Sequence, residues 1–491
     1  MNYRKFYIAT IVFFLYCGLF SFGNSTIFNN NHISNNNINS SDLSIANGDS
    51  WEVTWGSIGA DPCYAFTKDS LDNFYLIGET ATQTDSYCAV IKFNSSGGLE
   101  WAQSEETMDF GYIITTDYLD DVYFASKVND DIHLFKYNNS TGSELWNYTW
   151  EAPGTYDLLN TLMTDPYNRT YLAGYSGYYE SNITLYTLNS TTGTDIWNVS
   201  WTRGLADLFS GMVLDPLNNT YLYGNSMNNE TYDYDACVIK FNSTGGLLWN
   251  VTWGGDDDEY SSTNSLIALD SLNNVYIAGE TQSYGLGETD MFLVKYNSAG
   301  VKQWEKIYGG ISTEFTQALG VDSSNNVYVA GQTSSFPLGD TNNYLIKYDS
   351  NGQYQWNYTF GERVTLASSC MVIDSSDNIY IGGEHRYYEI TIYKFDSSGD
   401  LIWTGEWGGD EDDELVGIML DSSDNLYLAG TTESYGAGAQ DMFLVKNPPR
   451  AGGDGVPGMI IPSYNLIILV VLISISSIFL TRKLLNLSNN S

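Results

Sequence analysis

Residues 249–303 read WNVTWGGDDDEYSSTNSLIALDSLNNVYIAGETQSYGLGETDMFLVKYNSAGVKQ, and a unit close to this one occurs eight times in the chain. Each unit holds an anchor Trp: Trp51, Trp101, Trp146, Trp197, Trp249, Trp304, Trp356 and Trp403. Each also holds an Asp followed six residues later by a Tyr: Asp69/Tyr75, Asp117/Tyr123, Asp165/Tyr171, Asp215/Tyr221, Asp270/Tyr276, Asp322/Tyr328, Asp374/Tyr380 and Asp421/Tyr427. A period of about 50 residues is typical of a β-propeller, in which each repeat forms one four-stranded blade.

Short runs rich in β-branched and aromatic residues predict the strands of each blade. In the quoted unit these runs lie at 265–270, 275–279, 290–296 and 301–309, and Asn, Asp, Ser and Gly separate them. The last unit ends after three such runs, whereas residues 49–56 form a lone run of the fourth type. We therefore expect an all-β, eight-bladed propeller over 49–447 in which the N-terminal strand completes the last blade.

Four repeated features are predicted to build this scaffold. Aromatic residues four positions after the anchor predict packing between blades, with a ligand platform as the alternative; the Trp residues there are Trp55, Trp150, Trp201, Trp253 and Trp407. The Asp opens a D-x-x-[DN] turn, which predicts Asx-type hairpin bonding, with calcium as the alternative. A Gly three residues after the Tyr, present in seven units, predicts a close backbone approach. A Lys in the third run, replaced once by Thr187, predicts a repeated ion pair or hydrogen bond.

The repeat pattern W-x-x-x-x-G-G, D-x-x-x-N-x-Y-x-x-G-x-T, D-x-F-x-x-K-Y resembles the SBBP-type β-propeller repeat family of secreted bacterial and archaeal proteins. The matching segments are Trp249–Gly255, Asp270–Thr281 and Asp290–Tyr296, followed by Trp403–Gly409, Asp421–Thr431 and Asp441–Lys446. The resemblance covers roughly residues 51–447 and implies a fold rather than a function. That family is usually described with seven blades, so the count of eight departs from it.

A second resemblance is to the propellers of pyrroloquinoline-quinone (PQQ) dehydrogenases, which also have eight blades and a D-x-x-T-G-x-x-x-W turn. Similar turns lie at 137–146, 241–249, 348–356 and 395–403. The resemblance implies an adjacent Cys-Cys pair beneath the cofactor of such an enzyme. This chain contains no adjacent pair of cysteines, which argues against a quinoprotein.

The two ends of the chain predict export and anchoring. Residues 1–23 have the basic start, apolar core and small residues of a secretory signal, and the Asn/Ser-rich residues 24–48 predict a flexible spacer. After a linker at 448–458, the 22 uncharged residues 459–480 predict a transmembrane helix. Basic residues follow it, so 481–491 is expected in the cytoplasm and the propeller outside, at the cell surface.

The carboxy-terminal tail resembles the anchors of archaeal surface proteins, some of which are processed by a sorting enzyme. Retention as a plain single-span anchor is the interpretation that we prefer, and processing remains the alternative.

Sequons and cysteines agree with an exported protein. Four sequons occupy one position just after the anchor Trp, on the expected outermost strand, and predict a glycosylated rim: Asn147, Asn198, Asn250 and Asn357. After removal of the signal, Cys63, Cys88, Cys237 and Cys370 remain. Cys63 and Cys88 are expected about 9–10 Å apart on the first and third strands of one blade, which is too far for a disulfide. Free, mostly buried thiols are therefore predicted.

Charge and residue types limit the chemistry. The net charge of −39 excludes nucleic acid as a partner and leaves cations, basic proteins and glycans. The three histidines, His32, His133 and His385, show no metal spacing, and no nucleophile elbow is present. Carboxylate pairs for glycosidase chemistry exist in so acidic a chain, but no pair is singled out. No catalytic residue is assigned, and no cofactor is expected.

Topology places the variable loops, those from second to third strands and from fourth strands to the next blade, on one face, here called the loop face. The tight hairpin turns lie on the opposite face, here called the turn face. A candidate binding surface on the loop face consists of Tyr178, Tyr179, Tyr232, Tyr234, Tyr284, Phe336, Tyr387, Tyr388 and Tyr435. Acidic loops there give candidate calcium ligands at Asp256, Asp257, Asp258, Asp410, Asp412 and Asp413. The alternative is that both sets are solvated polar loops.

The sequence therefore predicts a membrane-anchored extracellular propeller that is not an enzyme and that binds a protein or glycan or serves in surface architecture. The alternative is a quinoprotein-like or polysaccharide-acting enzyme that uses the central face of the propeller.

Overall fold

The computed structural model describes residues 42–47, 50–81, 86–106, 110–128, 131–150, 157–177, 181–261, 266–335, 342–361, 364–385 and 389–449. The predicted signal peptide, most of the predicted spacer, the predicted transmembrane helix and the predicted cytoplasmic tail lie outside these residues. Across the described ranges, no helix is long and apolar enough to span a membrane.

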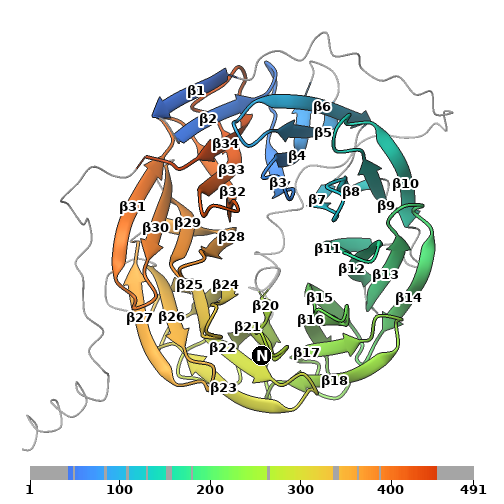
Figure 1. Cartoon of the computed structure of the whole chain (residues 1–491). Helices are drawn as coiled ribbons and strands as arrows, with labels where there is room; N and C mark the ends of the chain where they lie inside the picture. The colour runs from blue at the N-terminus through green and yellow to red at the C-terminus, as the bar shows by residue number, and fades with distance from the viewer. Residues whose placement is uncertain are drawn as a thin grey trace, which may run out of the picture. The chain divides into compact units, whose positions relative to one another are not determined.

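The strands form an eight-bladed β-propeller (Figure 1). The innermost strands of blades 1 to 8 are β3 (Cys63–Lys68), β7 (Phe110–Thr116), β11 (Asp157–Asp165), β15 (Asp207–Leu214), β19 (Glu259–Tyr260) with β20 (Ile267–Leu269), β24 (Glu314–Val321), β28 (Val364–Ile373) and β32 (Asp413–Leu420). The second strands are β4 (Phe74–Ala81), β8 (Val122–Val128), β12 (Arg169–Ser176), β16 (Thr220–Met227), β21 (Val275–Thr281), β25 (Val327–Thr333), β29 (Ile379–His385) and β33 (Leu426–Thr432).

The outer half of each blade contains two more strands. The third strands are β5 (Ser86–Phe93), β9 (Asp131–Tyr137), β13 (Asn182–Asn189), β17 (Tyr234–Phe241), β22 (Asp290–Tyr296), β26 (Asn342–Tyr348), β30 (Ile390–Phe395) and β34 (Asp441–Lys446). The fourth strands are β6 (Leu99–Glu106), β10 (Glu144–Trp150), β14 (Asp195–Trp201), β18 (Leu247–Trp253), β23 (Lys302–Tyr308), β27 (Tyr354–Phe360), β31 (Leu401–Trp407) and β2 (Ser50–Trp55).

The N-terminal strand closes the ring, as the sequence predicts. β2 pairs antiparallel with β34, with Trp51 opposite Lys446, and so supplies the fourth strand of blade 8. One prediction is wrong in part: residues 42–47 of the expected spacer form β1 (Asp42–Asn47), which pairs with β2 outside the blade (Figure 1). The overall Asn/Ser-rich composition of the segment concealed this strand. β1 covers the outer backbone edge of β2, which would otherwise be open.

The repeated Asp organises every inner hairpin. Asp270 Oδ1 accepts the backbone N–H groups of Leu272 and Asn274 at 3.0 and 2.9 Å, and Oδ2 accepts the Tyr276 hydroxyl at 3.3 Å. The same Tyr-to-Asp bond is present in all eight blades. The Asx residue at the fourth turn position has a left-handed φ of 56° to 68° in every blade, which Asn and Asp tolerate better than other non-glycine residues. The predicted Asx turn is confirmed.

The repeated Gly lies where two strands approach closely, as predicted. A Cβ on Gly331 would lie 1.9 Å from the Phe315 carbonyl oxygen, beside a bulge in the first strand of the blade. Gly174 and Gly430 meet a carbonyl oxygen at the same distance. A side chain at this position would therefore push the first two strands apart.

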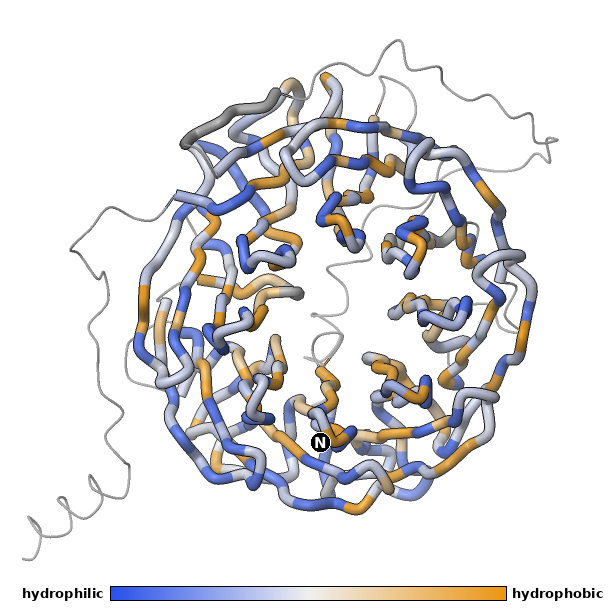
Figure 2. Tube along the Cα trace, in the orientation of Figure 1, coloured by the Kyte–Doolittle hydropathy of each residue, from blue (hydrophilic) through white to orange (hydrophobic). Residues whose placement is uncertain are grey.

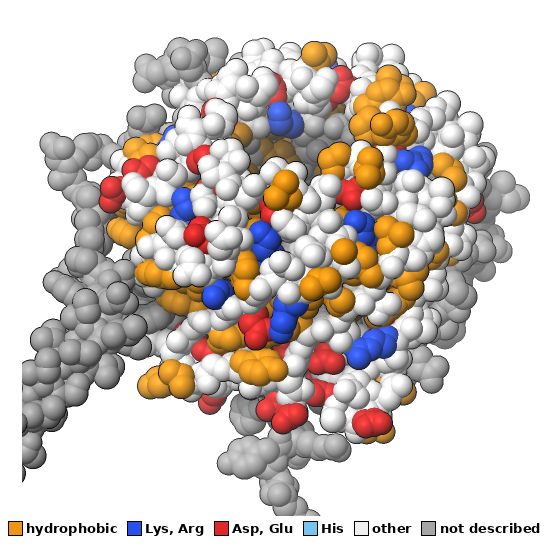
Figure 3. Space-filling model, turned by 60° about the horizontal axis from the view of Figure 1, so that its bottom comes forward, with side chains coloured by type: hydrophobic (Ala, Val, Ile, Leu, Met, Phe, Trp, Pro, Cys, Tyr) orange, Lys and Arg blue, Asp and Glu red, His pale blue; other side chains and the backbone are white. Residues whose placement is uncertain are grey.

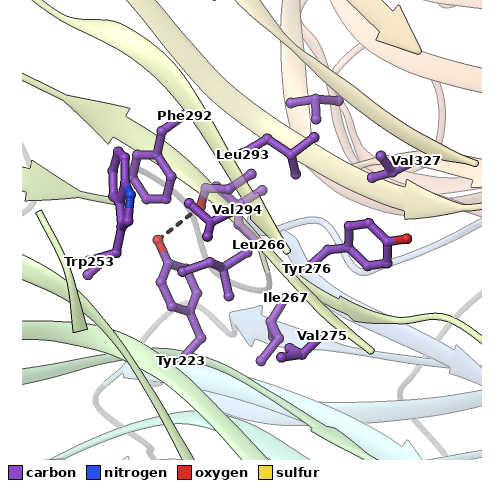
Figure 4. Packing of buried hydrophobic residues seen from close by; sticks show 14 of the residues in the cluster. Tyr223, Trp253, Leu266, Ile267, Val275, Tyr276, Phe292, Leu293, Val294 and Val327 are labelled. Carbon is purple, nitrogen blue, oxygen red and sulfur yellow. Dashed lines mark hydrogen bonds between the residues drawn. The ribbon is translucent and has the colours of Figure 1, made fainter. Parts of the chain in front are cut away.

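The core lies between blades rather than within one centre. Among the described residues, buried hydrophobic side chains form six clusters, each with members from at least two neighbouring blades. Figure 2 shows hydrophobic positions in the strands all around the ring. In one cluster the ring centroids of Trp253 in blade 4 and Phe292 in blade 5 lie 4.5 Å apart (Figure 4). In the same cluster the Tyr223 hydroxyl of blade 4 donates a hydrogen bond to the Ala278 carbonyl of blade 5. The predicted packing role of the second aromatic stripe is confirmed.

The third-strand Lys makes the predicted ion pair, and in six of the seven blades that carry it the partner is the repeated Asp. Lys295 Nζ lies 3.1 Å from Asp270 Oδ2 with both side chains buried, and Lys136 pairs with Asp117 at 2.9 Å. Lys92 instead pairs with Glu100 of the same blade, at 3.0 Å. In blade 3, where Thr187 replaces the Lys, Arg169 takes its place: its Nε donates to Asp165 and its Nη1 to the Ser243 carbonyl of blade 4, both at 2.7 Å.

The exchange of Lys for Arg169 gives a test of this network. We expect Arg169→Ala to lower the free energy of unfolding by about 2–4 kcal/mol, because it leaves the buried Asp165 without its cation. Adding Thr187→Lys should restore most of the loss, because residue 187 lies opposite Tyr171 in the register that Lys295 holds opposite Tyr276. Urea denaturation measures both changes.

The matched control is Arg203→Ala, whose side chain is half exposed and should cost less than about 1 kcal/mol. A double variant no more stable than Arg169→Ala would contradict the assignment.

Candidate functional site

The structure gathers acidic side chains in a pocket of about 370 Å³ between blades 7 and 8 on the loop face. It is lined by Glu384, His385, Asp412, Asp413, Glu414, Thr431, Glu433 and Gln440. Five of these eight residues are acidic, and none of the described residues that line it is Lys or Arg. The pocket therefore favours a positively charged group.

The end of β29 and the start of β32 position the two inner carboxylates. Glu384 Oε1 accepts the backbone N–H of Leu415 at 2.8 Å and so ties blade 7 to blade 8. Glu280 makes the equivalent bond to Thr316 in blades 5 and 6. Asp413 Oδ2 accepts the Gly409 N–H at 2.9 Å and the Ser434 hydroxyl at 2.8 Å, whereas its buried Oδ1 accepts no hydrogen bond.

Two carboxyl groups of this pocket hold their protons more tightly than usual. Burial raises the pKa of Glu384 to about 7, and the charges of Glu414 and Asp412 add to this effect against the Leu415 hydrogen bond, which lowers it. Burial and the neighbouring charges of Glu433 and Asp413 also raise the pKa of Asp412. A cation in the pocket would relieve this repulsion, and a carboxyl that titrates near neutral pH is also suited to proton transfer.

The predicted aromatic surface is only partly brought together. Tyr284 and Tyr435 are partly exposed but serve the scaffold: their hydroxyls donate to the Gly254 and Gly408 carbonyls, and their rings lie over Trp residues. Tyr232 is exposed at a left-handed turn. Tyr234 begins β17, half-buried, and its N–H donates to Asp258. Tyr178, Tyr179, Phe336, Tyr387 and Tyr388 lie outside the described residues.

The candidate calcium ligands do not converge. Asp256 and Asp257 are exposed, Asp258 binds the Tyr234 N–H, and Asp410 is exposed in the loop before Asp413. Among the described residues, no group of three or more His, Cys, Asp or Glu side chains is arranged to hold a metal ion. On the face that Figure 3 shows, charged side chains of both signs lie singly among small hydrophobic patches.

The structure also describes the four predicted glycosylation sites and the four cysteines that remain after the signal. Asn147, Asn198 and Asn250 are exposed on the outermost strands, whereas Asn357 is half-buried and its amide donates to the Tyr308 hydroxyl. Cys63, Cys88, Cys237 and Cys370 are free and buried, and burial raises the pKa of each thiol.

Comparison with known proteins supports the fold and leaves the function open. No family model matches the chain. The regulatory protein FlaEY of Caulobacter vibrioides is 26% identical over 187 residues, which cover 32% of this chain and 19% of that protein. The chain thus spans about a fifth of the length of the curated relative that it matches.

Two solved structures share the architecture at low sequence identity. A europium-containing methanol dehydrogenase has a TM-score of 0.51 at 10% identity, over 85% of this chain and 95% of that one. Dihydro-heme d1 dehydrogenase NirN also has a TM-score of 0.51 at 10% identity, over 79% of this chain and 75% of its own. These likenesses agree with the expected fold-level resemblance to dehydrogenase propellers.

The raised pKa of Glu384 predicts that stability falls as pH rises. The folded state holds the Glu384 proton up to about pH 7, whereas an unfolded Glu releases its proton near pH 4.3. The protonated carboxyl therefore contributes fully to the free energy of unfolding at low pH, and this contribution is lost as pH rises through 7. Between pH 5 and pH 8, Glu384→Gln should therefore lose about 1–3 kcal/mol less of its free energy of unfolding than the wild type does. Urea denaturation at each pH measures this difference. The exposed neighbour Glu433→Gln should keep the wild-type profile. Parallel profiles for wild type and Glu384→Gln would refute the prediction.

Proposed function

We propose that this chain is a membrane-anchored, extracellular β-propeller that acts as a non-catalytic binding module, and that its loop face takes a positively charged group of a protein or glycan. The observation that carries the proposal is the acidic pocket, in which Glu384, Asp412 and Asp413 meet with no Lys or Arg among the described lining residues. The net charge of −39 would steer a cationic partner toward the protein. The apolar segment 459–480 and the signal-like residues 1–23 support the anchored, exported location.

Binding of defined cationic probes tests the proposed site. A lysine-rich decapeptide and a glucosamine oligomer should bind the full-length protein in detergent, more weakly as salt rises from 0.05 to 0.5 M. The double variant Asp412→Asn/Glu433→Gln should weaken binding at least fivefold, measured by calorimetry. The matched control, Asp256→Asn/Asp257→Asn, removes the same charge from the acidic loop of blade 5 and should bind as the wild type does. Equal loss in both variants would show that net charge alone attracts the probes.

Glycosylation of the rim is a separate part of the proposal. Asn147, Asn198 and Asn250 project from the outer strands, where glycans would leave both faces open. We expect the protein from its native host to exceed its polypeptide mass. Asn250→Gln should reduce that excess by one glycan in intact-mass measurement, whereas Asn357→Gln should have less effect because the amide of Asn357 is engaged by Tyr308. A native mass equal to that of the polypeptide would contradict this part.

A polysaccharide-acting enzyme is the second candidate, favoured by one observation, namely the raised pKa of Glu384 beside other carboxyl groups. Hydrolysis of a polysaccharide that Glu384→Gln abolishes would replace the binding proposal. A quinoprotein fits the residues poorly: among the four described cysteines, Cys63 and Cys88 lie on different strands of blade 1, and Cys237 and Cys370 lie in blades 4 and 7, so no adjacent pair is present to support such a cofactor.

A further inference from the structure

The seam that closes the ring holds two buried carboxyl groups on the loop face. Asp441 begins β34, the third strand of blade 8, and Asp61 lies between β2, which completes blade 8, and β3 of blade 1 (Figure 1). The two segments are adjacent, because the Asp61 N–H donates to the Gln440 carbonyl at 2.7 Å. Asp61 and Asp441 each have an exposed fraction of 0%. The seam therefore brings together two acidic groups that bulk solvent does not reach.

The two carboxyl groups face each other beside Gly56. A Cβ on Gly56 would lie 1.8 Å from Asp441 Oδ1 and 3.1 Å from Asp61 Oδ2, so these two oxygens are within about 5 Å of each other. Only a glycine leaves room for the Asp441 oxygen at this position. Burial raises the pKa of Asp441, and the neighbouring charge of Asp61 adds to this effect. A positive charge between the two groups would relieve their repulsion.

One oxygen of each group is held by the chain and the other is not. Asp61 Oδ2 accepts the Ser57 N–H at 2.6 Å and the Ser57 hydroxyl at 3.0 Å. Asp441 Oδ2 accepts the Gly438 N–H at 2.9 Å. These hydrogen bonds favour the ionised form of both groups. Asp61 Oδ1 and Asp441 Oδ1, by contrast, are buried and accept no hydrogen bond from the described residues.

The junction between blades 5 and 6 repeats this arrangement. A Cβ on Gly309 would lie 1.8 Å from Asp290 Oδ1 and 2.3 Å from Glu314 Oε2. Asp290 Oδ1 is buried without a donor, whereas Oδ2 accepts the N–H groups of Leu286 and Gly287, both at 3.0 Å. Asp290 is 1% exposed and Glu314 is 0% exposed. The facing pair is therefore a feature of blade junctions and not of the seam alone.

A third junction shows what such a pair attracts. Between blades 4 and 5, Asp235 Oδ1 and Glu259 Oε2 would lie 1.9 and 2.3 Å from a Cβ on Gly254. Here the guanidinium of Arg203 lies 3.8 Å from Asp235 Oδ2 and supplies a positive charge. Within the described ranges, no ion pair joins a Lys or Arg to the acidic pairs of the other two junctions.

We propose that the seam holds a calcium ion between Asp61 and Asp441, and that the junction of blades 5 and 6 holds a second one between Asp290 and Glu314. Carboxylate oxygens are ligands that hard cations prefer. Two oxygens about 5 Å apart can share a calcium ion, whose bonds to oxygen are about 2.3–2.6 Å long, whereas the bonds of about 2.0–2.1 Å that Mg²⁺ forms are too short for this span.

Each site has only two acidic side chains, so backbone carbonyls and water must supply the remaining ligands. At the seam the Ser57 carbonyl oxygen belongs to the same loop and would lie 2.5 Å from a Cβ on Gly438. The Ser312 carbonyl oxygen has the same relation to Gly287 beside the second site, at 2.1 Å. Carbonyl oxygens of the adjoining blade are thus present next to both pairs.

A calcium ion at the seam would join the two ends of the propeller sequence. Asp61 follows the N-terminal strand β2, and Asp441 begins the last strand β34, so one ion would bind both. Its removal would leave two buried charges that repel each other where the ring closes. Ring closure would then depend on calcium, whatever ligand the loop face takes and wherever the protein lies.

Calcium binding to the full-length protein in detergent tests both sites. After treatment with EGTA and gel filtration, calorimetry should find two ions with dissociation constants of about 10⁻⁴–10⁻³ M, and calcium should raise the melting temperature. Asp441→Asn should bind one ion, and Asp290→Asn/Asp441→Asn should bind none. In EGTA, Asp441→Asn should melt at or above the wild-type temperature, because the repulsion with Asp61 is gone, so its lost ion cannot result from unfolding.

The matched control is Asp256→Asn/Asp257→Asn, which removes two charges from an exposed acidic loop and should still bind two ions. A wild-type protein that binds no calcium, with a melting temperature that calcium leaves unchanged, would overturn the proposal and indicate that each pair shares a proton. Equal binding by the wild type and Asp441→Asn would overturn the site at the seam.

Discussion

In blades 1 to 6, one cation with little exposure bonds both to a carboxylate of its own blade and to a carbonyl of the next blade. Removing an ammonium group from water is costly, and the cost is offset where the group finds a carboxylate and further acceptors in fixed positions. Lys295 meets this condition, with Asp270 at 3.1 Å within its blade and the Ser350 carbonyl at 2.9 Å in the next. Asp270 also holds the turn and the Tyr276 hydroxyl, so hairpin shape and blade packing depend on the same carboxylate.

The sequence predicted the features that recur from blade to blade, because each repeated residue meets a requirement of the backbone next to it. The Asx position needs a left-handed φ, the Gly needs to pass a carbonyl, and the lone first strand needs a partner. Features that depend on contacts between distant residues were missed. Arg169 replaces the missing Lys of blade 3 because it lies on β12 two residues before Tyr171, so both side chains are on the same face of the strand. This relation between Arg169 and Tyr171 could have been recognised in the sequence. β1 could have been found from the alternation of Leu43 and Ile45.

The acidic pocket illustrates the limit of sequence reasoning. The sequence singled out Asp412 and Asp413 as candidate ligands because they lie in an acidic loop. Glu384 lies about thirty residues earlier, directly after a repeated Gly, and the residue at this position is also acidic in blades 1 and 5. Its raised pKa comes from burial against blade 8 and from charges on that blade. No pattern within one repeat contains that information, because the blades are related only through the closed ring.

The two faces of the propeller differ in how they treat buried charge. On the turn face each Asp of the inner hairpin is bound by backbone N–H groups and a Tyr hydroxyl, and most are also paired with a cation. On the loop face, carboxylates face each other: a Cβ on Gly309 would lie 1.8 Å from Asp290 Oδ1 and 2.3 Å from Glu314 Oε2, so the two oxygens are within about 4 Å. Asp290 Oδ1 accepts no hydrogen bond, and the pKa of Glu314 is raised by its burial and by Asp290.

A buried carboxyl oxygen without a donor favours whatever brings it positive charge, whether a proton or a bound cation. Asp413 belongs to this set and also lines the acidic pocket, where its Oδ1 lies buried without a donor. The turn face therefore has little to gain electrostatically from a ligand, whereas the loop face is stabilised by one of positive charge. This difference, rather than the shape of either face, supports the proposal that a ligand would bind on the loop face.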